Sequence, residues 1–178
     1  MELPDEIKKN IVEMVNELKD DGAAVKWVEA NNLHATLKFL GWVEERELEN
    51  ITGLAARAAA GTKSFKVKLE GMGTFPPGKS PRVIWVGITE GGDKLKALAN
   101  SLEKSFSQAG YREEEREFTS HITVGRVKER KGVDKLKEKM ESFKDAKLGE
   151  AWVDSISVMK STLTPKGPVY EKIKEVKL

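Results

Sequence analysis

Two copies of one short pattern contain every histidine of this 178-residue sequence. The stretch "HATLKFLG" begins at His34 and "HITVGRV" begins at His121, and a threonine follows each histidine two places later, at Thr36 and Thr123. An imidazole has an ordinary pKa near 6.5, so at neutral pH one imidazole can accept a proton while another donates one. Each such transfer accelerates a reaction by roughly 10²–10⁴-fold. Two imidazoles and two hydroxyls around one site suit a phosphate group.

Alternation along a strand separates these polar residues from a core. Successive strand residues face opposite sides, so His34, Thr36 and Lys38 share one face. The residues between them are apolar: Ala35, Leu37 and Phe39. The second pattern has the same division, with isoleucine and valine opposite its histidine and threonine. We therefore expect both histidines to point away from the core, with Lys38 and Arg126 adding positive charge for an anion.

The repetition decides between a functional and a structural interpretation of the histidines. One His-x-Thr in a strand carries little weight, because partly buried histidines and exposed threonines are ordinary. Two copies that use both histidines, each with an apolar face opposite, favour a shared catalytic role. A two-histidine metal site is the main rival, but no carboxylate stands at ligand spacing and threonine is a poor zinc ligand. We predict neither a metal nor another cofactor.

Composition narrows the class of protein. The sequence has no cysteine, which excludes disulfides, thiolate catalysis and sulfur-rich metal sites. It has no apolar run of membrane-spanning length and no secretory signal, so we expect a cytoplasmic protein without membrane contact. Lys and Arg number 31 against 29 Asp and Glu, a net charge of +2. Proteins that coat nucleic acid usually carry a strong basic excess, so an anionic ligand here requires a local cluster of cations.

Hydrophobic periodicity predicts alternating helices and strands over the whole length. Helices are predicted over residues 3–18, 44–60, 93–109 and 133–143. Strands are predicted over residues 24–28, 34–40, 64–72, 82–88, 120–127, 151–160 and 169–176, with a short or ragged strand over 111–118. The order helix, strand, strand, helix, strand, strand occurs twice, and the two histidines occupy equivalent places in it. This order indicates an internal duplication.

The duplication predicts an α+β fold in a single domain over residues 1–178. Two lobes, approximately 1–90 and 91–178, would be related by a pseudo-two-fold axis. We expect two antiparallel sheets lining a central cleft, with the helices outside. The two His-x-Thr strands would then line this cleft from opposite sides.

Three motifs in order resemble those of the 2H phosphoesterase superfamily, and within it the RNA 2′,3′-cyclic phosphodiesterases, also called 2′-5′ RNA ligases. "NLHATLKFLG" resembles the first motif of this family, and "FTSHITVGRV" resembles the second, including the arginine after the glycine. "KSTLTPKGPVYE", residues 160–171, resembles the C-terminal signature. The resemblance covers nearly the whole sequence and implies a bilobal fold without metal or bound cofactor.

The same resemblance implies an enzyme that opens a 2′,3′-cyclic phosphate at an RNA 3′ end and leaves a 2′-phosphate. His34 and His121 would be the acid–base pair, and Thr36 and Thr123 would donate hydroxyl hydrogen bonds to the phosphate. We assign the base to His34 and the acid to His121, an order that the near-symmetric motifs leave open.

Further contacts with the substrate are expected outside the two histidine–threonine pairs. Arg126 falls on the arginine that contacts phosphate in the family. Strand alternation would put Arg126 on the core face, unless Gly125 allows a bulge that re-aims it. In the C-terminal motif, Lys160, Lys166 and Tyr170 are candidates for contacts with RNA, although the prolines and glycine there suit a plain hairpin equally well.

The predicted partner is RNA with a cyclic phosphate at its 3′ end, with transfer RNA fragments suggested by resemblance alone, and the predicted state is a monomer. Two other functions stay open. The same site working in the opposite sense would join RNA ends, and a binding module would keep the pocket without turnover. Family members usually begin with an apolar strand, whereas this sequence begins almost inside its first helix. Either a strand precedes this start or the first lobe does without one, and a missing strand would leave an unpaired sheet edge near His34.

Overall fold

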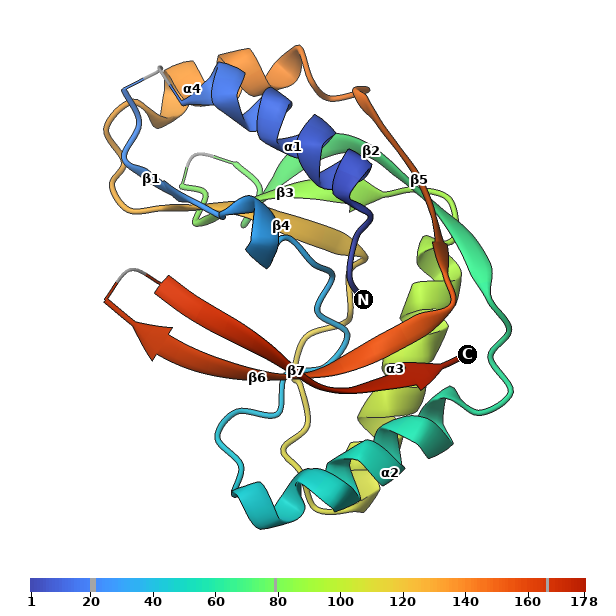
Figure 1. The fold of residues 1–178 in the computed structure, drawn as a ribbon. Helices are drawn as coiled ribbons and strands as arrows, with labels where there is room; N and C mark the ends of the chain where they lie inside the picture. Colours follow the sequence, from blue (N-terminus) through green and yellow to red (C-terminus); the bar gives the residue numbers. More distant parts are fainter. Residues whose placement is uncertain (20–21, 79, 166) are drawn as a thin grey trace.

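The computed structural model describes residues 1–19, 22–78, 80–165 and 167–178 (Figure 1). Within these ranges the helices are α1 (Asp5–Leu18), α2 (Leu48–Ala59), α3 (Gly92–Gln108) and α4 (Val133–Glu141), with two 3-10 turns, η1 (Ala30–Asn32) and η2 (Glu45–Glu47). The strands are β1 (Val25–Trp27), β2 (Phe65–Phe75), β3 (Val83–Ile88), β4 (His121–Val127), β5 (Lys147–Val153), β6 (Ser155–Thr164) and β7 (Gly167–Lys177). Each predicted helix therefore forms close to its predicted bounds.

The strands of the described chain form two antiparallel sheets. In the larger, five-stranded sheet the order is β1-β4-β3-β2-β5, so β3 and β4 lie in its interior. The segment "RVIWVGI", which is apolar on both faces, supplies the central strand β3. The smaller sheet is the hairpin β6–β7. The predicted α+β class with two antiparallel sheets is confirmed.

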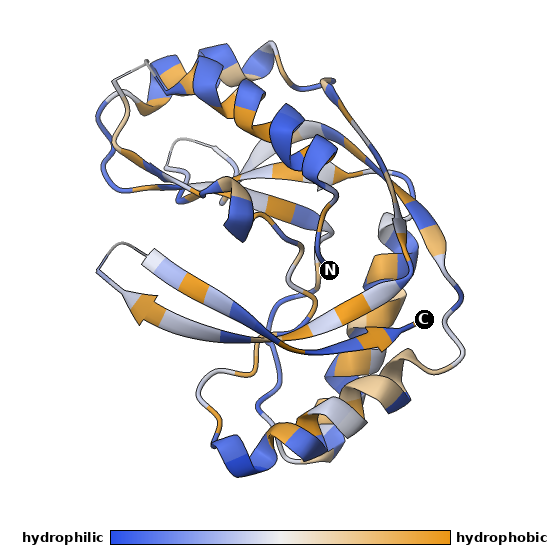
Figure 2. Ribbon diagram, viewed as in Figure 1, coloured by the Kyte–Doolittle hydropathy of each residue, from blue (hydrophilic) through white to orange (hydrophobic). Residues whose placement is uncertain are grey.

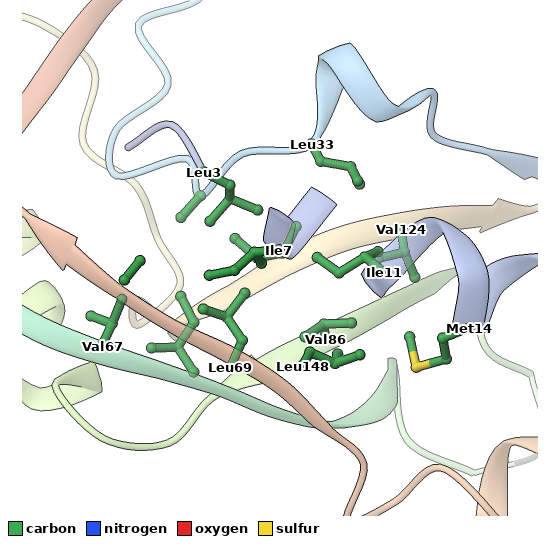
Figure 3. Close-up of a cluster of buried hydrophobic side chains, with 14 of the residues drawn as sticks. Leu3, Ile7, Ile11, Met14, Leu33, Val67, Leu69, Val86, Val124 and Leu148 are labelled. Carbon is green, nitrogen blue, oxygen red and sulfur yellow. The ribbon is translucent and has the colours of Figure 1, made fainter. Parts of the chain in front are cut away.

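α1 and α4 cover one face of the five-stranded sheet, and the β6–β7 hairpin lies on the other side (Figure 1). The apolar residues of α1 recur at helical spacing and form one buried stripe: Ile7, Ile11, Met14, Val15 and Leu18. Figure 3 shows members of this stripe in one cluster with Val86 of β3 and Val124 of β4. This core fixes the backbone of β4, whose first residue is His121.

A second core lies between α2, α3 and the β6–β7 hairpin. Its buried residues are Ile51, Leu54, Ala55, Ala58, Ala59, Leu98, Leu102, Phe106, Ile156 and Val176. Hydrophobic and hydrophilic residues alternate along α1 and α3, as expected for helices with one buried side (Figure 2). Leu37, three residues after His34, packs against both cores and so joins them.

These two cores do not correspond to the two halves of the sequence. The larger sheet combines β1, β2 and β3 with β4 and β5, which come from opposite sides of residue 90. α1 packs in the same core as α4, and α2 packs with α3. The expected lobes of approximately 1–90 and 91–178 are therefore wrong as a division of the chain. The physical reason is that β4 pairs between β1 and β3 and does not begin a sheet of its own.

The first His-x-Thr segment is not the strand that alternation predicted. Apart from one bridge between Glu2 and His34, it has no strand partner in the described part of the chain. Beside this bridge, Met1 and Ala35 exchange hydrogen bonds of 2.9 and 3.0 Å, so the expected open edge is covered at this point. The predicted alternation holds as far as Leu37, with Ala35 buried and Thr36 exposed. It fails after that, since the Lys38 side chain is buried and Phe39, which it assigned to the core, is 71% exposed.

Two other predicted strands also differ in the structure. Residues 111–118 form no strand, because this charged run offers no apolar face. The predicted strand 151–160 is divided at Asp154 between β5 and β6, which belong to different sheets. The backbone N–H of Leu178 donates to the Asp154 carbonyl at 2.9 Å and holds this change of direction. None of the helices in the described ranges has an apolar stretch long enough to cross a membrane.

Candidate active site

The backbone around His34 fixes one nitrogen of its imidazole. The turn η1 brings the carbonyl oxygen of Asn32 to 2.8 Å from His34 Nδ1. A carbonyl only accepts, so Nδ1 carries a proton and donates it. In the neutral ring Nε2 is then an acceptor, and it lies 3.0 Å from Thr36 Oγ1. The two residues of the first predicted pair are therefore in direct contact.

The surroundings of His34 favour its neutral form. Desolvation is the largest cause lowering the pKa of this imidazole below 6.5, and the hydrogen bond to the Asn32 carbonyl acts in the opposite direction. Tyr170 of β7 contacts the imidazole edge-on, with ring centroids 5.0 Å apart and an interplanar angle of 72°. The C-terminal motif thus meets the first His-x-Thr, and a neutral ring at this position can accept a proton.

His121 is held by the same kinds of contact. The carbonyl of Thr119 lies 2.7 Å from His121 Nδ1, which leaves Nε2 for other groups. Phe75, at the end of β2, contacts the ring edge-on with centroids 5.1 Å apart and an angle of 87°. Each imidazole therefore has a carbonyl two residues before it and one aromatic neighbour. His121 differs in lying on β4, which is paired with β1 and β3.

β4 presents its chemical groups on the face of the sheet away from α1 and α4. Ile122 and Val124 are 0% exposed in the first core, so His121 and Thr123 point the other way. We call this side the hairpin face, because the β6–β7 hairpin lies beyond it (Figure 1). Trp85 of β3 is paired with Thr123 and shares the hairpin face.

A bulge in β4 decides where Arg126 points. The register between β3 and β4 shifts by one residue at Val124, and both Val124 and Gly125 are buried. Alternation resumes one residue late, which leaves Arg126 exposed on the hairpin face with His121. Gly125 is required here, because an added Cβ would lie 2.9 Å from Cε3 of Trp27. The bulge that would re-aim Arg126 is therefore present.

The ammonium group of Lys38 forms its contacts within the protein. Its Nζ donates to Oε1 of Glu103 on α3 at 2.8 Å and to the carbonyl of Arg112 at 2.7 Å. The Lys38 side chain is only 5% exposed. The predicted substrate contact for Lys38 assumed a strand, and the chain instead turns toward α3 after Thr36. The structure does not bring this ammonium to the histidines.

Of the candidates in the C-terminal motif, Tyr170 contacts a histidine and Lys160 does not. Lys160 pairs with Glu45 of η2 at 2.8 Å, whereas Tyr170 on the neighbouring strand contacts His34. Lys166 lies outside the described residues. His34 has the Asn32 carbonyl and the Thr36 hydroxyl as polar partners, and His121 has the Thr119 carbonyl. Within the described ranges no group of three His, Cys, Asp or Glu side chains is arranged to hold a metal ion.

Two contributors to the site were missed by reasoning from the sequence. Asn32 holds His34 through its carbonyl, and its side-chain amide also donates to the Pro168 carbonyl of β7 at 3.1 Å. Phe75, which contacts His121, lies beyond the end of the predicted strand 64–72. No residue-type signal marks a carbonyl acceptor, since every residue has one, and the place of Phe75 depends on the pairing of β2 with β3.

The chain belongs to the 2′-5′ RNA ligase superfamily, whose family model matches residues 3–164. Within it, a relative from Methanocaldococcus jannaschii named RNA 2′,3′-cyclic phosphodiesterase is 39% identical, over 98% of this chain and 96% of its own. A relative of the same name from Thermotoga maritima is 37% identical, over 98% of this chain and 91% of its own. The predicted family is therefore confirmed.

A solved structure confirms the fold. The crystal structure of E. coli LigT complexed with 3′-AMP has a TM-score of 0.79 to this chain at 25% identity. The match covers 100% of this chain and 94% of that chain. The fold is thus shared by a protein that has been crystallised with a nucleoside monophosphate.

Proposed function

We propose that this protein is an RNA 2′,3′-cyclic phosphodiesterase, which opens a terminal cyclic phosphate to a 2′-phosphate and a 3′-hydroxyl. The observation that carries the proposal is the common arrangement of the two imidazoles. Each has Nδ1 held by a backbone carbonyl, which leaves Nε2 for proton transfer. Relatives named for this activity, aligned over nearly the whole chain, support the assignment.

In the proposed reaction His34 is the general base. Its lowered pKa keeps the ring neutral at neutral pH, so Nε2 can take a proton from a water molecule. The water oxygen bonds to phosphorus while the bond from phosphorus to O3′ breaks. His121, in its protonated form, gives the Nε2 proton to the departing O3′. The histidines then exchange protons with solvent before the next turnover.

Hydroxyl and guanidinium donors stabilise the charge that grows on the non-bridging oxygens. In the described part of the chain, the Thr123 hydroxyl and the Arg126 guanidinium have no partner, so both are available to the phosphate. The Thr36 hydroxyl already contacts His34 Nε2 at 3.0 Å. It must turn from the imidazole to the phosphate as the water takes its place beside Nε2.

The same groups can serve a ligation reaction. If the 5′-hydroxyl of a second RNA replaces water, His34 takes its proton, O3′ leaves as before, and a 2′-5′ phosphodiester forms. The name of the superfamily is the observation that favours this second activity. Joined products and hydrolysed products differ in length, so one gel distinguishes them.

The proposal is tested with an RNA that ends in a 2′,3′-cyclic phosphate, incubated with the protein and a chelator. We expect product in excess of protein, a phosphate retained on the 2′-hydroxyl, and a bell-shaped dependence of kcat/KM on pH. A 3′-phosphate product would contradict the assigned leaving group. Stoichiometric binding without turnover would instead indicate a binding module.

The remaining proposals concern the setting of the enzyme. We propose a monomer that acts in the cytoplasm on RNA ends such as transfer RNA fragments. The absence of cysteine and the resemblance of the three motifs support this assignment. Light scattering on the purified protein measures the mass in solution, and sequencing of RNA with cyclic-phosphate ends from cells lacking the protein identifies the substrates.

A further inference from the structure

Unpaired cations gather at one end of β4, although the whole chain carries a net charge of only +2. Elsewhere, many lysines are neutralised by ion pairs, among them Lys66 with Glu150 and Lys172 with Glu2. Around the end of β4, by contrast, four cations have no hydrogen bond or ion pair within the described residues: Lys26, Arg82, Arg126 and Lys128. This is the local cluster that an anionic ligand requires.

Arg126 and Lys26 of this cluster adjoin the proposed phosphate site, whereas Arg82, opposite Val127, lies across the end of β4 on the other face of the sheet. Arg126 lies on the hairpin face with His121 and Thr123, and Lys26 of β1 is paired with Arg126, so the two side chains share that face. The seven residues of β4 extend over about 20 Å from His121 to the far end of the strand. A cyclic mononucleotide held at the histidines therefore ends well before Lys128.

A surface pocket of about 440 Å³ lies at this far end. Its lining includes three cations, Arg82, Lys128 and Arg130, and one carboxylate, Glu129. Arg130 is held by a hydrogen bond to the Ser80 hydroxyl, while Arg82 and Lys128 are exposed. The pocket is therefore a site with excess positive charge, and part of that charge is held in place.

The side chain of Lys26 reaches from β1 to the start of β7. A Cβ on Gly167 would lie 3.5 Å from Nζ of Lys26, so this ammonium reaches the turn between β6 and β7. The Asn32 amide joins the same hairpin at the Pro168 carbonyl. Lys26 therefore lies between Arg126 of the proposed phosphate site and the start of β7.

We propose that the end of β4 is a binding site for the RNA backbone upstream of the terminal nucleotide. In this assignment, which rests on the proposed function, Lys26 meets the first upstream phosphate, and the pocket of Arg82, Lys128 and Arg130 holds phosphates further toward the 5′ end. The ligand class is single-stranded RNA, recognised through its phosphodiesters and independently of base sequence. The enzyme is thereby selective for RNA ends over free cyclic nucleotides.

The test compares two substrates with a charge-reversed variant, Arg82→Glu with Lys128→Glu. For a decanucleotide ending in a cyclic phosphate, we expect kcat/KM to fall at least about tenfold. The slope of log affinity against log salt should decrease by about 0.7 for each phosphate that the variant no longer neutralises. For 2′,3′-cyclic AMP, kcat/KM should stay within about twofold. Lys63→Glu with Lys104→Glu, two exposed and unpaired lysines away from β4, is the matched control and should change neither substrate.

Three results would overturn the proposal: no loss on the decanucleotide, an equal loss on both substrates, or the same loss in the control variant. Thermal melting of each variant checks that the fold is intact. Fluorescence anisotropy with a decanucleotide ending in a 2′-phosphate measures the same interactions without turnover. If the wild-type protein proved inactive, the proposed function would fail, while the anisotropy comparison would still decide the binding site.

Discussion

The segment around His34 and the strand around His121 support their imidazoles in the same way on different backbones. Each ring donates from Nδ1 to the carbonyl two residues before it, and each has an aromatic neighbour edge-on. His121, however, pairs with Gly87 of β3 within the five-stranded sheet, whereas His34 has a single isolated bridge. The segment after His34 is held instead by the ion pair of Lys38 with Glu103.

This difference suggests how two similar motifs take unlike roles. Burial lowers the pKa of His34, which suits a base that must be neutral when the substrate arrives. In the second motif, the pairing of β4 with β3, with its bulge, places His121, Thr123 and Arg126 on one face of the sheet. In the proposed reaction, the surroundings of His34 thus tune a proton acceptor, and β4 supplies a fixed frame for the phosphate.

The largest expected effect comes from removing either histidine, because the proposed reaction needs both. His34→Ala or His121→Ala should each lower kcat by at least about 10³-fold on an RNA with a cyclic phosphate, because each removes one proton transfer. The double variant should cost little more than either single one, since the two act in one step. Steady-state kinetics with circular dichroism as a folding check measure this. Near wild-type rates in either single variant contradict the acid–base pair.

Substitutions of the two threonines test whether the two histidines have different roles. Thr123→Ala should lower kcat about 10²-fold, as expected for loss of one donor to the transition state. Thr36→Ala should lower kcat by a similar factor and also move the acid limb of the pH profile, because its hydroxyl touches His34 Nε2. Thr36→Ser and Thr123→Ser, which keep the hydroxyl, are the controls. A moved acid limb in Thr123→Ala alone would reverse the assignment of the base.

Substitutions in the Lys38–Glu103 ion pair test how the segment after His34 is held in place. Lys38→Met should lower the free energy of unfolding by about 2 kcal/mol, less than for a fully buried pair because Glu103 is partly exposed. The double variant Lys38→Met with Glu103→Gln should recover part of that loss. Urea denaturation measures both. KM for 2′,3′-cyclic AMP should not change, and a large rise in KM would restore Lys38 as a substrate contact.

The smallest expected effect concerns the aromatic cover of His34. The acid limb of kcat/KM should lie below pH 6.5, because the base is active only when neutral and burial lowers its pKa. Tyr170→Ala exposes the ring and should move this limb to higher pH, with Tyr170→Phe as the control that keeps the aromatic ring. Glu2 and the Met1 amine act on the same pKa in opposite directions and are unchanged in both variants. An acid limb that does not move would show that Tyr170 contributes no desolvation.

The helices and the placement of several candidate site residues could be predicted from local patterns. The stripe of α1 and the double His-x-Thr depend on spacing within a few residues, which the sequence displays directly. Arg126 is the clearest case, because alternation and family position disagreed and Gly125 indicated the bulge that reconciles them. Each of these inferences needed only the residues next to the one in question.

What could not be predicted depends on contacts between distant segments. The place of β4 between β1 and β3 is a choice of partners that no local pattern specifies. Lys38 was assigned to the substrate because Glu103, its partner 65 positions away, cannot be recognised from the sequence. The division at Asp154 was missed for the same reason, since apolar residues continue on both sides while the chain changes sheets.

The interleaving of the two cores makes each half of the polypeptide dependent on the other. A cut in the exposed turn at Thr89 and Glu90 would separate the two histidines onto different fragments. β4 of the second fragment would then have to insert between β1 and β3 of the first before either imidazole met a phosphate. Catalytic activity of the two fragments would therefore be recovered only when they associate.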